Sequence, residues 1–185
     1  MLFQGQEFGA STPFLYFADA PEWLGEAVKE GRRKFLAQWR TLRTAEMIRE
    51  LPDPCSEDAF QRSKLDRSKA NVELYALHCD LLKLRHTDPV ISNQQRGSFD
   101  GAIISEHAFV YRIFSEQHGD RLLVVNLGPD LHLDPAPEPL LAPMEDAEWK
   151  ILFSTEHPRY GGGGTPPLDT EENWRVPAQS AVLLG

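Results

Sequence analysis

The spacing of apolar residues changes once along this chain, near residue 90, and this change limits the possible fold more than any other feature. Between residues 69 and 87, leucines recur every three or four positions, which is the spacing of one face of an α-helix. They are Leu74, Leu77, Leu81 and Leu84. Asp88-Pro89 ends this pattern, because the residue before a proline avoids helical angles. After Val90, short runs rich in Val, Ile, Phe, Tyr and Leu alternate with polar turns, which is typical of antiparallel strands.

These patterns predict an α+β fold, in which a mostly helical part, residues 1–90, is followed by an antiparallel all-β sandwich domain, residues 91–185. In the first part we expect helices over 22–39 and 69–87, and a short helical turn from Ser56 to Arg62. The strands expected in the second part are 101–105, 108–115, 121–127, 131–133, 149–153 and 180–184, with a hairpin turn at 117–120. The polar stretch 92–98 is the expected junction between the two domains.

The charge and hydropathy of the chain exclude several kinds of partner. The 185 residues include 19 basic and 28 acidic side chains, a net charge of −9, and most of the excess lies in the second half. An acidic balance repels phosphate backbones, so we expect no nucleic-acid partner. No apolar run reaches the ~18 residues of a membrane span, and no signal peptide is recognisable, which favours a cytoplasmic protein without a membrane partner.

The motifs that hold cofactors or metals are not found in the sequence. The two cysteines, Cys55 and Cys79, have no CxxC neighbour, and the six histidines are dispersed, so we expect neither a metal site nor a disulfide framework. Four glycines, 161–164, are followed by Thr165 and two prolines, which does not fit a phosphate-binding loop. The adjacent carboxylates Glu57-Asp58 and Glu171-Glu172 are interpreted as solvated surface. We therefore expect no cofactor.

Residues 1–19, MLFQGQEFGASTPFLYFAD, have the composition of a strand end that opens onto a sugar-binding cleft. The apolar pair Leu2-Phe3 leads into a loop of Gly, Ser, Thr and Pro that carries one carboxylate, Glu7. The loop also carries four aromatic residues, Phe8, Phe14, Tyr16 and Phe17. Sugars stack their apolar faces on aromatic rings while carboxylates bond their hydroxyls, and barrel enzymes place such groups at strand ends. A purely structural role for Glu7 remains the alternative.

Three patches of the sequence resemble malto-oligosyltrehalose trehalohydrolase, a glycosidase family of the alpha-amylase clan. The first is QGQEFGASTPFLYFAD at 4–19. The second is FQRSKLDRS at 60–68, which leads into ELYALHCDLLKLRHTDPV at 73–90. The third combines WKILFSTEHPRYGGGG at 149–164 with VPAQSAVLLG at 176–185 and is similar to the closing strands of the clan's C-terminal domain. Together the patches span essentially the whole chain.

The resemblance implies that this chain is the C-terminal part of such an enzyme, beginning at the last strand of a (β/α)₈ barrel. In the clan the three catalytic carboxylates lie on the fourth, fifth and seventh barrel strands, so none of them maps onto this chain. We therefore expect no catalytic residue here and no activity of the chain alone. The residues expected to bind substrate in an intact barrel are Glu7, Phe8, Phe14, Tyr16 and Asp19.

The implied parent reaction is hydrolysis of the α-1,4 bond next to the terminal trehalose of maltooligosyl trehalose. The expected partner of a completed barrel is thus an α-glucan or maltooligosyl trehalose. Two alternatives remain open: a stand-alone carbohydrate-binding or interaction module, and one half of a split enzyme. Residues 1–39 are also expected to mediate self-association, since residues 2–17 contain seven large apolar side chains that two helices would not readily cover.

Overall fold

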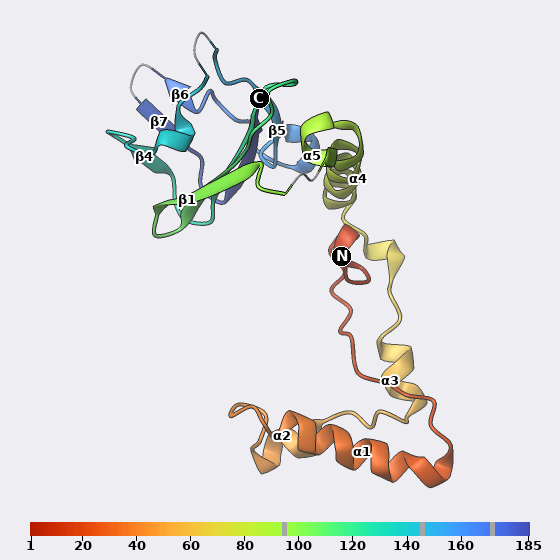
Figure 1. Ribbon diagram of the computed structural model, residues 1–185. Coiled ribbons are helices and arrows are strands. Elements are labelled where there is room, and N and C mark those ends of the chain that lie inside the picture. Colours follow the sequence, from red (N-terminus) through yellow and green to blue (C-terminus); the bar gives the residue numbers. More distant parts are fainter. Residues whose placement is uncertain (94–95, 145–146, 171–172) are drawn as a thin grey trace. The chain divides into compact units, whose positions relative to one another are not determined.

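The chain forms two compact units, Met1–Asn71 and Val72–Gly185 (Figure 1). The computed structural model describes residues 1–93, 96–144, 147–170 and 173–185. Helices precede antiparallel sheets along the chain, so the predicted α+β class is confirmed. The division between the compact units falls between Asn71 and Val72, ahead of the long leucine-rich helix. The domain boundary expected at residues 90–91 stays a prediction. Part of the expected junction, residues 94–95, lies outside the described residues.

The N-terminal unit is built from helices, and side chains cap the starts of α2, α3 and η2 but not those of η1 and α1. Its elements are η1 (Gln6–Phe8), α1 (Glu22–Leu36), α2 (Ala45–Glu50), α3 (Glu57–Arg62) and η2 (Arg67–Lys69). The hydroxyl of Thr44 accepts a hydrogen bond from the Met47 amide, and that of Ser56 accepts one from the Ala59 amide. Such caps satisfy amides that the first helical turn leaves without partners.

No residue of 1–71, all of which the structure describes, lies in a strand. The strand end expected at Leu2-Phe3 is therefore not formed. A strand needs a neighbouring strand for its backbone groups, and here the Phe3 carbonyl accepts from the Gln6 amide instead. The Phe3 amide in turn donates to Oε1 of Gln6, so the segment closes into a local turn.

The C-terminal unit contains two antiparallel sheets. One sheet has the strand order β1-β2-β3-β8-β5, and the other has the order β4-β7-β6. Their bounds are β1 (Phe99–Ser105), β2 (Ala108–Ile113), β3 (Arg121–Asn126), β4 (Leu131–Leu133), β5 (Ile151–Ser154), β6 (Asp169–Thr170), β7 (Asn173–Val176) and β8 (Ser180–Leu184). Two short 3-10 helices, η3 (Pro139–Leu141) and η4 (Pro158–Tyr160), lie in the connections. Six of these strands were expected from the sequence, and β6 and β7 were not.

The two sheets share one hydrophobic core. Alternate residues of β3 are buried, since successive side chains of a strand point to opposite faces. The core side chains are Val110, Leu122, Val124, Leu141, Leu168, Trp174, Val176, Val182 and Leu184. They come from both sheets and from the connections, so the sheets and the proline-rich segment between them are stabilised together.

Two further helices, α4 (Val72–Thr87) and α5 (Pro89–Asn93), belong to this unit. Asp88 lies between them, and its Oδ1 accepts hydrogen bonds from the amides of Val90 and Ile91. Its Oδ2 accepts one from Nε of Arg121 at 2.8 Å. Burial acts to raise the pKa of Asp88, but the hydrogen bonds from Arg121 and from the two amides outweigh it and hold the pKa below its usual value.

Helix α4 is fastened to the sheet unit near its middle. The Tyr160 hydroxyl donates to Oδ2 of Asp80 at 2.7 Å, and Nη1 of Arg159 lies 3.0 Å from the same oxygen. Burial, and then the hydrogen bond and charge of Asp80, raise the pKa of Tyr160 to about 12. These contacts explain why the boundary between the compact units falls before α4.

A buried ion pair joins the hairpin of β2 and β3. Arg112 and Asp120 are both 7% exposed, and Oδ2 of Asp120 lies 2.8 Å from Nε and 2.7 Å from Nη2 of the arginine. Oδ1 of Asp120 accepts from the Ser115 amide, and Nη1 of Arg112 donates to the carbonyls of Leu140 and Ala142. Each charge is thus paired and hydrogen-bonded, which burial of a charge requires.

Replacing Asp120 by asparagine should destabilise the C-terminal unit by about 3–5 kcal/mol, because the Arg112 charge stays buried without a counter-charge. Hydrogen exchange of the β2 and β3 amides measures this free energy of opening for the C-terminal unit alone. Glu106→Gln, at an exposed turn, is the control and should change it by less than about 0.5 kcal/mol. Equal effects of the two substitutions would contradict the structural role of the pair.

The raised pKa of Tyr160 predicts a pH dependence of α4 docking. Because the folded pKa lies above the unfolded value of about 10, the contribution to stability is complete below pH ~10 and is lost as the pH rises through about 12. Ultraviolet titration should show one tyrosine ionising near pH 12, and Tyr160→Phe should remove that transition. Tyr75→Phe should leave it in place. Ionisation of all four tyrosines near pH ~10 would refute the contact.

Candidate functional site

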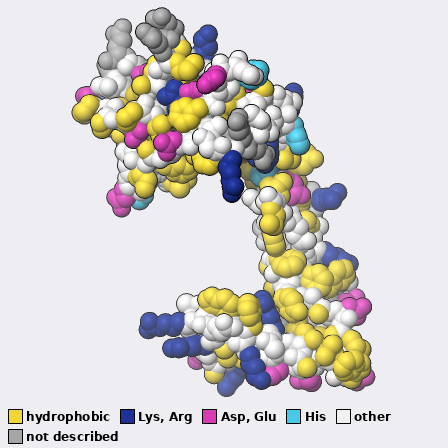
Figure 2. All heavy atoms as spheres, viewed as in Figure 1, with side chains coloured by type: hydrophobic (Ala, Val, Ile, Leu, Met, Phe, Trp, Pro, Cys, Tyr) yellow, Lys and Arg dark blue, Asp and Glu magenta, His cyan; other side chains and the backbone are white. Residues whose placement is uncertain are grey.

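Four phenylalanine rings form a continuous row on the N-terminal unit. The centroids of Phe3 and Phe14 are 5.2 Å apart, those of Phe14 and Phe17 6.0 Å, and those of Phe17 and Phe60 5.2 Å. All four rings are more than a third exposed, and hydrophobic side chains gather along this unit in Figure 2. Edge-to-face and tilted ring contacts hold the rings in order, but they leave much of the apolar surface uncovered.

The loop that carries three rings of the row is fixed by hydrogen bonds to residues on either side of α3. The Leu15 amide donates to Oγ of Ser63 at 3.0 Å, and the Ala18 amide donates to the Pro54 carbonyl at 2.7 Å. At the start of the loop, Gly5 has a φ of +81°, and a Cβ there would lie 2.6 Å from Cβ of Ala10. Only glycine fits this turn without strain, and the turn directs the loop toward α3.

A cavity of about 460 Å³ opens at the end of the aromatic row. The rings of Phe17 and Phe60, the carboxylates of Asp19 and Glu57 and the hydroxyl of Ser56 are among the groups that line it. Aromatic faces pack against the C–H groups of a sugar ring, and carboxylates accept hydrogen bonds from its hydroxyls. The cavity therefore has the side-chain chemistry of a sugar-binding site.

One wall of this cavity is anchored to α1 by an ion pair. Nζ of Lys29 lies 2.9 Å from Oδ2 of Asp53, and Oδ1 of Asp53 accepts from the Cys55 amide. The hydrogen bond from Lys29, followed by that from the Cys55 amide, holds the pKa of Asp53 below its usual value. The pair orients the turn 53–56, which leads into α3 and whose residues 54–56 line the cavity.

The structure distributes the five expected substrate-binding residues over three settings. Asp19 lines the cavity, and Phe14 belongs to the aromatic row beside it. Tyr16 is exposed, with the guanidinium of Arg32 4.9 Å from the centre of its ring. Glu7 lies in η1, and Phe8 is only 5% exposed, with its carbonyl accepting from the Asn71 amide. Phe8 thus packs inside the unit, and the binding role of all five residues stays a prediction.

Of the residues that line the cavity, only Asp19 was among the five expected substrate-binding residues, and Glu57 and Phe60 are among those that were not. Both lie on α3, three residues apart, and such residues share one face of a helix. Glu57 was interpreted as solvated surface together with Asp58, and both are indeed exposed, but Glu57 also lines the cavity. The pair Glu171-Glu172 lies outside the described residues. In the described ranges, no three His, Cys, Asp or Glu side chains are grouped as metal ligands, and no helix could cross a membrane.

Comparisons with known proteins agree with the predicted resemblance. Residues 96–183 match a family model described as a domain of unknown function, DUF3459. The malto-oligosyltrehalose trehalohydrolase of Deinococcus radiodurans is 37% identical over 134 residues, which is 70% of this chain. That of Brevibacterium helvolum is 38% identical over 109 residues, or 54% of this chain. The resemblance to malto-oligosyltrehalose trehalohydrolase is confirmed.

The chain spans only about a fifth of these trehalohydrolases, 21% of the first and 18% of the second. A solved structure of a Salmonella typhimurium protein described as an alpha amylase matches with a TM-score of 0.67 and 25% identity. The match covers 99% of this chain and 27% of that one. The fold therefore corresponds to a part of a larger alpha-amylase-like protein.

Self-association through the aromatic row is a further prediction. Covering one exposed phenylalanine is worth about 1.5–3 kcal/mol, so a second copy that covers the row would be stabilised. The double variant Phe14→Ser, Phe17→Ser should lower the mass measured by light scattering toward the 20.9 kDa of one chain. Trp23→Ser is the control, since Trp23 is 81% exposed and outside the row. A wild-type chain that stays monomeric at high concentration would refute this prediction.

Proposed function

We propose that this chain is the C-terminal portion of a glycoside hydrolase of the malto-oligosyltrehalose trehalohydrolase type. The observation that carries the proposal is the 37% identity over 134 residues to the Deinococcus enzyme. The reaction of the complete enzyme would be hydrolysis of the α-1,4 bond next to the terminal trehalose of maltooligosyl trehalose. We place the protein in the cytoplasm, which its free cysteines, Cys55 and Cys79, favour.

The role proposed for this chain in that reaction is substrate binding rather than bond cleavage. Glycoside hydrolysis needs two carboxylates on opposite sides of the scissile bond, and we propose that other parts of the enzyme supply them. The cavity at Asp19 and Glu57 would accept hydrogen bonds from glucose hydroxyls, while Phe17 and Phe60 would pack against the sugar ring. Removing such a contact weakens the binding of substrate and of the transition state alike, so it should raise KM more than it lowers kcat.

A chimaera tests this proposal. The matching part of the Deinococcus trehalohydrolase is replaced by this chain, and trehalose release from maltooligosyl trehalose is measured. We expect an active chimaera, and we expect Asp19→Asn to raise its KM about tenfold, the effect of one lost charged hydrogen bond. Asp100→Asn, an exposed carboxylate of the other unit, should leave KM unchanged.

Two outcomes would contradict the proposal. A folded chimaera without trehalose release would refute the assignment to this enzyme type. Trehalose release by the isolated chain would refute the idea that bond cleavage depends on other parts of the enzyme. An equal KM for the Asp19→Asn and Asp100→Asn chimaeras would remove the cavity from the substrate site.

A further inference from the structure

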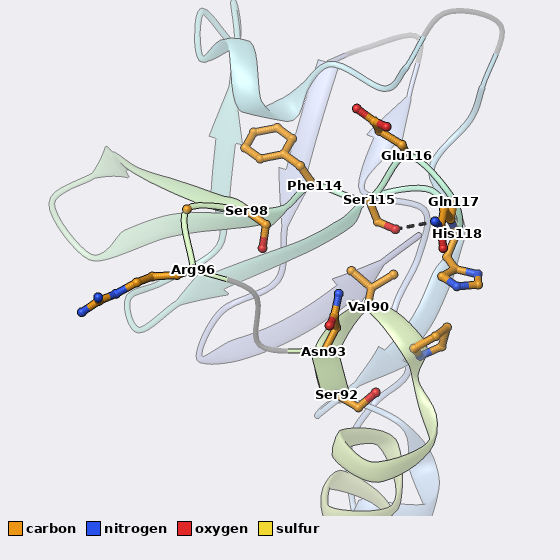
Figure 3. A pocket seen from close by; sticks show the side chains of 12 residues that line it. Val90, Ser92, Asn93, Arg96, Ser98, Phe114, Ser115, Glu116, Gln117 and His118 are labelled. Carbon is orange, nitrogen blue, oxygen red and sulfur yellow. Dashed lines mark hydrogen bonds between the residues drawn. The ribbon is translucent and has the colours of Figure 1, made fainter.

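The C-terminal unit has a cavity of its own, of about 760 Å³, formed by three segments of that unit (Figure 3). Helix α5 contributes Val90 and Asn93, and the chain entering β1 contributes Ser98. The β2–β3 turn, residues 114–118, forms the remaining wall. Figure 3 shows Val90 and Asn93 on the helix side of the cavity and Ser98 and Ser115 on the strand side.

The aromatic ring of this cavity is supported by the buried ion pair. Phe114 is 42% exposed, and the guanidinium carbon of Arg112 lies 5.6 Å from the centre of its ring. Arg112 is itself held by Asp120 and by two backbone carbonyls. The ring thus keeps its place without a ligand, and an aromatic group that is already fixed loses little entropy when a ligand packs against it.

The turn beside Phe114 is also fixed. The His118 amide donates to Oγ of Ser115 at 3.2 Å, and the Ser115 amide donates to Oδ1 of Asp120 at 2.9 Å. Nη1 of Arg121 donates to the His118 carbonyl at 3.2 Å. Because the backbone of the turn is tied in this way, the side chains of Glu116 and Gln117 project from a rigid frame.

The polar groups of the cavity suit a neutral ligand that is rich in hydroxyls. Within the described part of the chain, the side-chain amides of Asn93 and Gln117 form no hydrogen bond, and each offers both donors and an acceptor. Glu116 adds a carboxylate, which Figure 3 shows beside Phe114 on the side of the turn away from α5, and Arg96 extends away from the cavity. Phosphate recognition uses several basic side chains that point at the ligand, and the lining of this cavity does not provide such a group. The lining is also too polar to suit a lipid.

We propose that this cavity binds a short oligosaccharide that spans it, with one sugar ring packed on Phe114 beside Glu116 and the hydroxyls of further rings bonded to Asn93 and Gln117. The choice of an α-1,4-glucan as the oligosaccharide rests on the proposed function of the chain. The inference that the ligand is a sugar rests on the residues that line the cavity. The cavity would hold a glucan chain independently of the Asp19 cavity.

Titration calorimetry of the full chain with maltoheptaose tests the proposal, with cellohexaose and inorganic phosphate as the other ligands. We expect maltoheptaose to bind in the millimolar range. Phe114→Ala should weaken this binding about tenfold, the effect of a lost stacking contact. The matched control is Phe109→Ala, since Phe109 lies on β2, the strand that leads into Phe114, is 40% exposed and does not line the cavity.

Asn93→Ala and Gln117→Ala test the site even if the Phe114→Ala variant misfolds. Both side chains are exposed and neither belongs to the core, so we expect these variants to fold normally. Each should weaken maltoheptaose binding while leaving the denaturation midpoint unchanged. Phosphate binding in place of sugar, or maltoheptaose binding that all three variants retain, would overturn the site. Equal binding of cellohexaose would overturn the α-glucan assignment. The proposed function is tested by a different measurement, trehalose release by the chimaera, so the two proposals can fail independently.

Discussion

The buried pair of Arg112 and Asp120 is the interaction on which the C-terminal unit depends. It joins β2 to the turn before β3, and through two carbonyls it fixes the connection that contains η3. Trp149 packs over the same guanidinium at 5.2 Å and donates to the Leu141 carbonyl. A charge in an apolar core tolerates little displacement, because each lost hydrogen bond leaves a desolvated group. The pair therefore determines where the hairpin turn, η3 and the Trp149 segment lie.

The N-terminal unit is held together differently. Few of its apolar side chains are buried, namely Phe8, Pro54 and Ala59, while its aromatic row remains at the surface. Its order comes from capped helices, the Lys29–Asp53 pair and backbone contacts to Ser63 and Pro54. Small units bury a smaller fraction of their surface than large ones, so such local contacts supply a larger share of their stability.

The sequence allowed prediction of the elements whose pattern is local. Strands β1, β2, β3 and β8 are long apolar runs, and α4 repeats leucine at helical spacing, so each was expected at nearly its observed position. Strand β7 has only four residues in a segment of mixed polarity, and only its pairing with β4 and β6 identifies it. The contact between Asp80 and Tyr160, which links α4 to the rest of its unit, was also not predictable, because it joins residues that are 80 positions apart. Asp19 could be proposed as a site residue because it belongs to the aromatic loop itself. Phe60 could not, because it reaches the cavity from α3, a distant part of the sequence.

The order of the larger sheet has a consequence for the way this unit is synthesised. Strand β5 comes before β8 in the sequence, yet β8 lies between β3 and β5 in the sheet. Leu122 pairs with Leu184 across more than sixty residues, so β3 has an unpaired edge until β8 has been made. During that interval the growing chain presents an open strand, which is a site for pairing with other chains. Protection of the nascent edge of β3 would thus be needed most just before the ribosome reaches Ser180.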